Sequence, residues 1–156
     1  MKSIYLIIIA VMVFGCTTQS KKEEASSKEL ETTETVKEKE EIEIEDFESF
    51  FKRFGEDSIF QFTRVNFPIS YYTVDIEDNK EEYVYSKDDF WYTDFTKDVD
   101  AATQESDQYE PVTKKKSDTE ITYIRMGIDN GIRIEYYFEV DPKGKWQLIK
   151  IIDSSN

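Results

Sequence analysis

The sequence has no histidine and a single cysteine, Cys16, among its 156 residues. Without histidine the chain cannot form a Ser-His-Asp triad, a Cys-His dyad or an imidazole zinc site. One cysteine cannot form an internal disulfide or a four-thiolate metal cage. Basic residues are few as well, 20 against 34 acidic ones, which gives a net charge of -14. Nucleic-acid binding needs cations that neutralise phosphates, so we expect no nucleic-acid partner, and we expect neither a metal ion nor a cofactor.

A long apolar run is also missing. Residues 4–14 form an unbroken apolar run of 11 residues, whereas a transmembrane helix needs about 20 and a secretory signal core about 7 to 15. Gly15 stands directly before Cys16, and this pair after the apolar run resembles the lipobox of bacterial lipoproteins. The resemblance implies that residues 1–15 are a signal peptide and that Cys16 carries the lipid, which would hold the protein on a membrane. An ordinary secretion signal with an incidental cysteine is the alternative.

Residues 16–45 are interpreted as the lipidated cysteine and a solvated tether. From residue 17 to 45 there is no aromatic residue, glycine or proline, and 15 of the 29 residues are Lys or Glu. Such a segment buries too little apolar surface to offset the entropy of ordering it. Lys22-Glu23-Glu24 resembles the export signals of surface lipoproteins, or is simply part of the tether. We expect a lipid-anchored protein of the bacterial cell envelope, at the outer membrane, with the periplasmic and the surface face both left open.

Residues 46–156 contain 21 of the 23 aromatic residues and are predicted to form a single α+β domain. The four phenylalanines of 47–54 follow helical spacing and predict an amphipathic helix whose apolar stripe belongs to the core. Asp57 predicts a second short helix that ends at Arg64. Alternation then predicts a hairpin from residues 69–76 and 83–85, and a capping pattern at 86–89 predicts a short helix. Residues 96–117 are interpreted mostly as loop, followed by three antiparallel strands at about 119–127, 131–141 and 145–152.

This order of elements resembles the nuclear-transport-factor-two-like superfamily. The phenylalanines at 47, 50, 51 and 54, followed by Asp57, Phe60, Gln61, Arg64 and Phe67-Pro68-Ile69, are also similar to a bacterial lipoprotein family of unknown function. The resemblance implies N-terminal helices packed on a curved antiparallel sheet, in a cone that can enclose a pocket.

Strand alternation predicts which side chains line that pocket. Ile132, Ile134, Tyr136, Phe138 and Val140 form the apolar face of one strand and are expected to point inward. A turn with a glycine bulge at 141–144 would place three residues of the last strand opposite this face: Trp146, Leu148 and Lys150. Lys150 would then lie beside Tyr136, where it could bind an anionic ligand, or it would extend its ammonium group to the solvent-exposed opening of the cone.

The hairpin that joins 119–127 to 131–141 has two possible registers. A three-residue loop would turn Ile124 and Met126 inward and leave Arg125 outside, facing Glu135; we favour it because it buries apolar groups and pairs opposite charges. A two-residue loop would turn Tyr123 and Arg125 inward, where Arg125 could bind an acid. Arg64 either faces the pocket or binds helix-end carbonyls.

No inward carboxylate emerges from strand alternation, so catalysis is disfavoured. We expect a non-catalytic domain that binds a small molecule, a glycan or a protein, with a candidate pocket of Tyr136, Lys150, Arg125, Arg64 and Trp146. A structural lipoprotein with a filled cone is one alternative. An isomerase or dehydratase that uses a carboxylate with Tyr or Lys in the pocket is the other.

The outer face of the sheet is expected to carry three large apolar groups, Tyr137, Ile149 and Ile151, the last beside Glu135. Apolar patches of this kind often mark interfaces. The resembled superfamily commonly dimerises through this face, so we expect a weak homodimer, with cover by residues 96–117 as the alternative.

Overall fold

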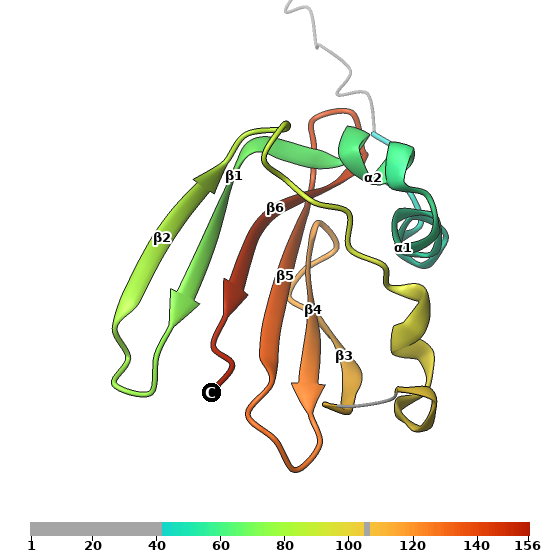
Figure 1. Cartoon of the computed structure of the whole chain (residues 1–156). Helices are drawn as coiled ribbons and strands as arrows, with labels where there is room; N and C mark the ends of the chain where they lie inside the picture. The colour runs from blue at the N-terminus through green and yellow to red at the C-terminus, as the bar shows by residue number, and fades with distance from the viewer. Residues whose placement is uncertain (1–41, 105–106) are drawn as a thin grey trace, which may run out of the picture. The chain divides into compact units, whose positions relative to one another are not determined.

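The computed structural model describes residues 42–104 and 107–156. The predicted signal peptide, Cys16 and the predicted tether up to residue 41 lie outside the described residues. The domain has an α+β fold in which two N-terminal helices pack on a curved six-stranded sheet (Figure 1), which confirms the predicted fold class.

Both predicted helices form, and an aspartate begins each. Helix α1 spans Phe47–Glu56, and the side chain of its N-cap Asp46 accepts a hydrogen bond from the backbone N–H of Ser49. Helix α2 spans Ser58–Thr63, and Asp57 accepts in the same way from Phe60. These two aspartates thus fix where each helix begins.

The strands are β1 (Val65–Val74), β2 (Lys80–Tyr85), β3 (Tyr109–Lys115), β4 (Glu120–Gly127), β5 (Arg133–Val140) and β6 (Trp146–Asp153). Their order in the sheet is β2-β1-β6-β5-β4-β3. Neighbouring strands are antiparallel except for β1 and β6, which are parallel, so the sheet is mixed where a purely antiparallel one was predicted. The β1–β2 hairpin is confirmed.

The segment between β2 and β4 differs most from its prediction. Residues 86–89 form a turn where a short helix was predicted. The predicted loop 96–117 contains two short 3-10 helices, η1 (Thr96–Val99) and η2 (Ala101–Thr103), and the edge strand β3. Strand β3 contains Pro111 and four polar or charged residues, Glu110, Thr113, Lys114 and Lys115, which is why its alternation was missed.

The core lies between α1 and the face of the sheet that carries Tyr136 and Phe138, which we call the inner face. The ring of Phe138 lies 5.4–5.8 Å from four phenylalanine rings of α1: Phe47, Phe50, Phe51 and Phe54. Phe50 and Phe54 are fully buried, and Phe47 and Phe51 pack beside them, so the predicted core role of the stripe is confirmed.

A bulge in β6 makes the predicted position of Lys150 wrong. Val140 pairs with Trp146 and Phe138 with Leu148, as expected, but the register then shifts so that Tyr137 pairs with Lys150. Ile149 is the extra residue, and from there on every side chain of β6 changes face.

Lys150 therefore points to the outer face, where its Nζ lies 4.0 Å from the centre of the Tyr137 ring. Ile151, predicted on the outer face, pairs with Tyr136 and is only 3% exposed. Ile152 takes its place opposite Glu135, and Asp153 follows on the inner face, where no carboxylate was predicted.

The favoured register of the β4–β5 hairpin is also wrong. Tyr123 pairs with Tyr136 and Arg125 with Ile134, so Tyr123 and Arg125 point inward, as in the alternative register. Gly127 closes the hairpin by donating to the carbonyl of Ile132, which leaves four residues in the loop where two or three were considered. Ile124 is nevertheless buried, on the outer face and outside the core cluster.

Candidate binding groove and its polar wall

A groove of about 860 Å³ lies between α1, η1 and strands β3 and β4. Its floor is apolar, and the rings of Phe51 and Tyr123 meet there with their centres 4.4 Å apart. Ile121 and Trp146 continue the floor, and Val99 and Pro111 stand at the side of η1 and β3. A volume of this size matches the sites that hold small molecules in proteins.

The charged side chains around the groove are mostly acidic. Four carboxylates without a buried cation partner line it, Asp46, Glu48, Glu56 and Asp118, together with two lysines, Lys52 and Lys115. Lys115 is paired with Asp118 at 2.7 Å, and both side chains are exposed. The groove therefore disfavours a negatively charged ligand.

Asp98 forms the polar wall of the groove and is only 2% exposed. Arg125 binds both of its carboxylate oxygens, with Nε donating to Oδ2 at 2.8 Å and Nη2 to Oδ1 at 2.9 Å. The hydroxyls of Tyr109 and Tyr123 donate to the same carboxylate, each at 2.8 Å. The buried charge is thus paired and fully hydrogen-bonded, which is the condition for keeping it in the interior.

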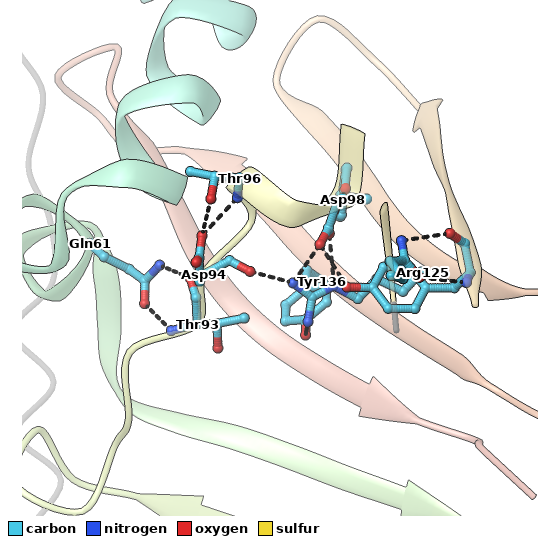
Figure 2. Close-up of polar contacts among 10 residues, drawn as sticks. Gln61, Thr93, Asp94, Thr96, Asp98, Arg125 and Tyr136 are labelled. Atoms are coloured by element: carbon cyan, nitrogen blue, oxygen red, sulfur yellow. Dashed lines mark hydrogen bonds and ion pairs between the residues drawn. The ribbon is translucent and has the colours of Figure 1, made fainter. Parts of the chain in front are cut away.

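The same arginine ties the segment 93–98 to the sheet, as Figure 2 shows. Arg125 Nη2 also donates to the carbonyl of Asp94 at 2.8 Å, and its Nη1 lies 3.3 Å from the Tyr136 hydroxyl. At the other end of the segment, the Gln61 amide donates to the carbonyl of Thr93 and accepts from its N–H. Two side chains, one from α2 and one from β4, therefore hold a segment that has no strand pairing of its own.

Burial raises the pKa values of the tyrosines in this network. Burial and the hydrogen bond to Asp98 raise the pKa of Tyr109 to about 12. Burial likewise raises the pKa of Tyr136 to about 12, and that of Tyr123 rises for the same reason and because Asp98 is adjacent. All three hydroxyls are therefore protonated at neutral pH; Tyr109 and Tyr123 donate to Asp98, whereas Tyr136 accepts from Arg125.

The five predicted pocket residues lie in four different places. Trp146 lines the groove, whereas Arg125 and Tyr136 lie behind Asp98. Arg125 binds Asp98, and Tyr136 accepts a hydrogen bond from Arg125. Arg64 forms a two-pronged ion pair with Glu45 at 2.8 and 3.0 Å and donates to the carbonyl of Trp146, not to helix-end carbonyls. Lys150 lies on the opposite face of the sheet. The acid that Arg125 binds belongs to the chain itself.

Sequence reasoning missed Asp98, Phe51 and Ile121 as groove residues. Phe51 follows the same helical spacing as the core phenylalanines. The sequence pattern therefore does not show that its side chain lies at the margin of the core instead of at its centre. A carboxylate in a polar segment does not show that an arginine 27 residues later folds over it. The one available signal was the alternative register that turned Arg125 inward, because an inward arginine requires an acid.

In the described part of the chain, no group of three or more His, Cys, Asp or Glu side chains could hold a metal ion. Within the same residues, no helix has the length and apolar character needed to cross a membrane.

The sequence profile of a domain of unknown function, DUF4348, matches residues 22–153. The chain belongs to the DUF4348 family. This match begins inside the segment that was predicted to be a tether. No match to a curated protein is found.

Solved structures similar to this DUF4348 chain come from Bacteroides. An NTF2-like protein of Bacteroides fragilis is 28% identical with a TM-score of 0.53, over 75% of this chain and 50% of that protein. A cystatin-like protein of Bacteroides caccae is 19% identical with a TM-score of 0.52, over 69% of this chain and 75% of that one. The DUF4348 chain spans only half of the Bacteroides fragilis protein. These likenesses agree with the nuclear-transport-factor-two-like fold.

Proposed function

We propose that this protein is a lipid-anchored bacterial envelope protein whose DUF4348 domain binds a small ligand without catalysis, in the groove between α1 and β3–β4. The observation that carries the proposal is the groove itself, about 860 Å³ with an apolar floor and an acidic rim. The ligand would have an apolar body for the floor of Phe51, Ile121 and Tyr123. It would carry no negative charge, because the rim and the net charge of -14 would repel one.

The state of Asp98 supports a binding role over a catalytic one. A general base must have a free lone pair within reach of its substrate. Both oxygens of Asp98 are occupied by Arg125 and by two tyrosine hydroxyls. The tyrosines in turn keep their protons, since burial raises their pKa values.

The binding test uses Nile red, an uncharged apolar dye that fluoresces in dry sites, added to the full chain. Thr113 is exposed on β3 and lines the groove, so Thr113→Trp should fill it and reduce dye binding about tenfold or more. Lys114→Trp is the matched control, because the neighbouring side chain points to the other face of the same strand. Laurate should compete less well than dodecanol. Equal dye binding by both variants would reject the groove as the site.

A structural envelope protein with a filled interior is the second candidate. Its support is the phenylalanine cluster around Phe138, which fills the middle of the inner face. Absence of any saturable binding of Nile red to the wild-type chain would favour this candidate.

The anchor rests on the lipobox resemblance at Gly15-Cys16 and has its own test. Radiolabelled palmitate should enter the protein in cells, and Cys16→Ser should abolish labelling. Labelling of the serine variant would show that Cys16 is not the lipid site. Protease treatment of intact cells would then distinguish an outward-facing from a periplasmic domain at the outer membrane.

A further inference from the structure

The groove is bordered on one side by the edge of the sheet. Strand β3 is the last strand there, and among the described residues its neighbour is β4. Backbone hydrogen bonds join Lys116 to Glu120 and Ile128 to Gln108 across this pair. Bonded and non-bonded pairs alternate in an antiparallel ladder, so every second residue of β3 turns its N–H and C=O away from β4. These residues are Tyr109, Pro111, Thr113 and Lys115.

One end of this edge is covered by the chain itself. The side-chain amide of Gln104 donates to the carbonyl of Tyr109 at 3.0 Å and accepts from its N–H at 2.9 Å, as a neighbouring strand would. The carbonyl of Pro111 and the N–H and C=O groups of Thr113 and Lys115 make no hydrogen bond with a described residue. We call these last three residues the open edge.

The open edge belongs to the groove. All three of its residues line the groove and are exposed to solvent. Helix α1 borders the opposite side, and Figure 1 shows it at the same end of the sheet as β3, away from β2. An open strand edge beside a pocket is an arrangement with which proteins bind extended peptides, because the edge supplies main-chain hydrogen bonds and the pocket takes alternate side chains.

We propose that the groove binds a short extended peptide segment of another protein, which adds to β3 as an antiparallel strand. The inference rests on the proposed binding function of the groove and names its class of ligand. Antiparallel pairing is the more stable per residue. It also puts the peptide residues that bond to Thr113 and Lys115 on the inner face, with their side chains toward the floor of the groove.

The groove also indicates the composition of the peptide. Residues that pair with the open edge would be apolar, because the floor carries the rings of Phe51 and Tyr123. The peptide would be basic, because the acidic rim and the net charge of -14 attract cations and repel acids. Proline and lysine, here Pro111, Lys114 and Lys115, are residues that keep strand edges from pairing with copies of the same chain. The occupant is therefore a partner segment and not a second β3.

The test measures binding of the peptide acetyl-Lys-Val-Thr-Val-Lys-amide to the full chain by isothermal titration calorimetry. Its two valines are placed to pair with Thr113 and Lys115, and we expect saturable binding. The peptide with glutamate in place of both lysines should bind about tenfold more weakly. Methylation of the two valine nitrogens removes the donors to β3 and should weaken binding about tenfold or more. Methylation of the threonine nitrogen, which points away from β3, should leave binding unchanged.

Two variants of the chain locate the site. Thr113→Pro removes the N–H of the open edge and should weaken peptide binding about tenfold. It spares the β3–β4 ladder because this N–H points away from β4, as it does at Pro111 in the same strand. Thr113→Val is the matched control, since it keeps the N–H, and it should bind the peptide like the wild type. Thermal unfolding shows whether each variant retains the fold.

Hydrogen exchange followed by NMR shows whether the peptide uses the open edge. In the free chain the amides of Thr113 and Lys115 should exchange fast, and saturating peptide should slow them about tenfold or more. Slow exchange without peptide would show that another segment of this chain or a second copy already covers the edge, and would overturn the proposal.

Nile red separates this inference from the proposed function. Dye binding by a chain that does not bind the peptide would keep the groove as a binding site and overturn strand addition alone. Binding of neither would reject both. Equal affinities for the peptide and its valine-methylated form would also overturn strand addition, because they would show that main-chain donors are not used.

Discussion

Asp98 is the residue on which the wall of the groove depends. It is the one described carboxylate that is both fully buried and bound by an arginine, and the hydroxyls of Tyr109 and Tyr123 also donate to it. Removal of one partner from such a buried pair leaves the other charge without compensation, which costs more than the pair contributed.

Asp98→Asn should therefore lower the free energy of unfolding by about 3 kcal/mol, because Arg125 would stay buried without its counter-charge. Urea denaturation measures this. Asp118→Asn is the control, since Asp118 pairs with Lys115 on the solvent-exposed surface and should leave stability close to that of the wild type. A similar, small loss in both variants would mean that the buried pair does not stabilise the fold.

The tyrosines of the wall predict a dependence of stability on alkaline pH. The pKa values of Tyr109 and Tyr136 are raised by burial from 10.0 to about 12 in the folded chain. Below about pH 10 these two tyrosines contribute fully to the free energy of unfolding. The contribution is lost as the pH rises through about 12, because the tyrosines lose their protons at a lower pH in the unfolded chain than in the folded chain. Unfolding in urea at about pH 9 and about pH 11 should show lower stability at the higher pH. Tyr109→Phe should reduce this difference, and an unchanged difference would assign the pH dependence to other groups.

At the scale of elements, the chain entering α1 is fastened to the β5–β6 turn. Glu45 donates its backbone N–H to the carbonyl of Gly144, and its own carbonyl accepts from the Trp146 indole. Gly144 has a φ of +78°, and a Cβ there would lie 2.2 Å from the carbonyl oxygen of Glu43, so the turn and the entering segment require glycine. Glu45, the last residue of the predicted tether, thus contacts the domain.

Glu45→Gln should destabilise the domain by about 1–3 kcal/mol, since it removes the charged partner of Arg64. Thermal unfolding of the full chain measures the change. Glu43→Gln serves as the control because Glu43 is exposed, and it should melt like the wild type. Melting of both variants at the wild-type temperature would show that the Glu45 contact is dispensable.

At the scale of the whole molecule, the outer face of the sheet has an apolar patch. Tyr137 and Ile149 lie there as predicted, with Ile152 where Ile151 was expected, and Lys150 lies over the Tyr137 ring. Ile124 is buried on the same face without belonging to the core cluster. We keep the homodimer as a proposal and place it on this corrected patch.

Ile149→Glu should shift the chain from dimer to monomer in light scattering at high protein concentration, because it adds a charge to the apolar patch. Ile76→Glu is the control, as Ile76 is 80% exposed in the β1–β2 turn and should leave the mass unchanged. A wild-type chain that is monomeric at high concentration would contradict the dimer.

The sequence by itself determined the elements whose signals are local. Caps at Asp46 and Asp57, the phenylalanine spacing of α1 and the glycine of the 141–144 turn depend on neighbours a few residues away, so the helices, the α+β class and the start of the β5–β6 pairing could be predicted. The family resemblance added the curved fold.

The tertiary structure alone decided which way the important side chains face. One extra residue in β6 reverses Lys150 and Ile151, and one extra residue in the β4–β5 loop turns Arg125 inward, because alternation in a strand has a period of two. The polar partners in the folded domain lie far away in the sequence: Asp98 binds Arg125, Glu45 binds Arg64 and Tyr71 binds Asp153. No local pattern records these pairs, so the candidate site became visible only in the folded chain.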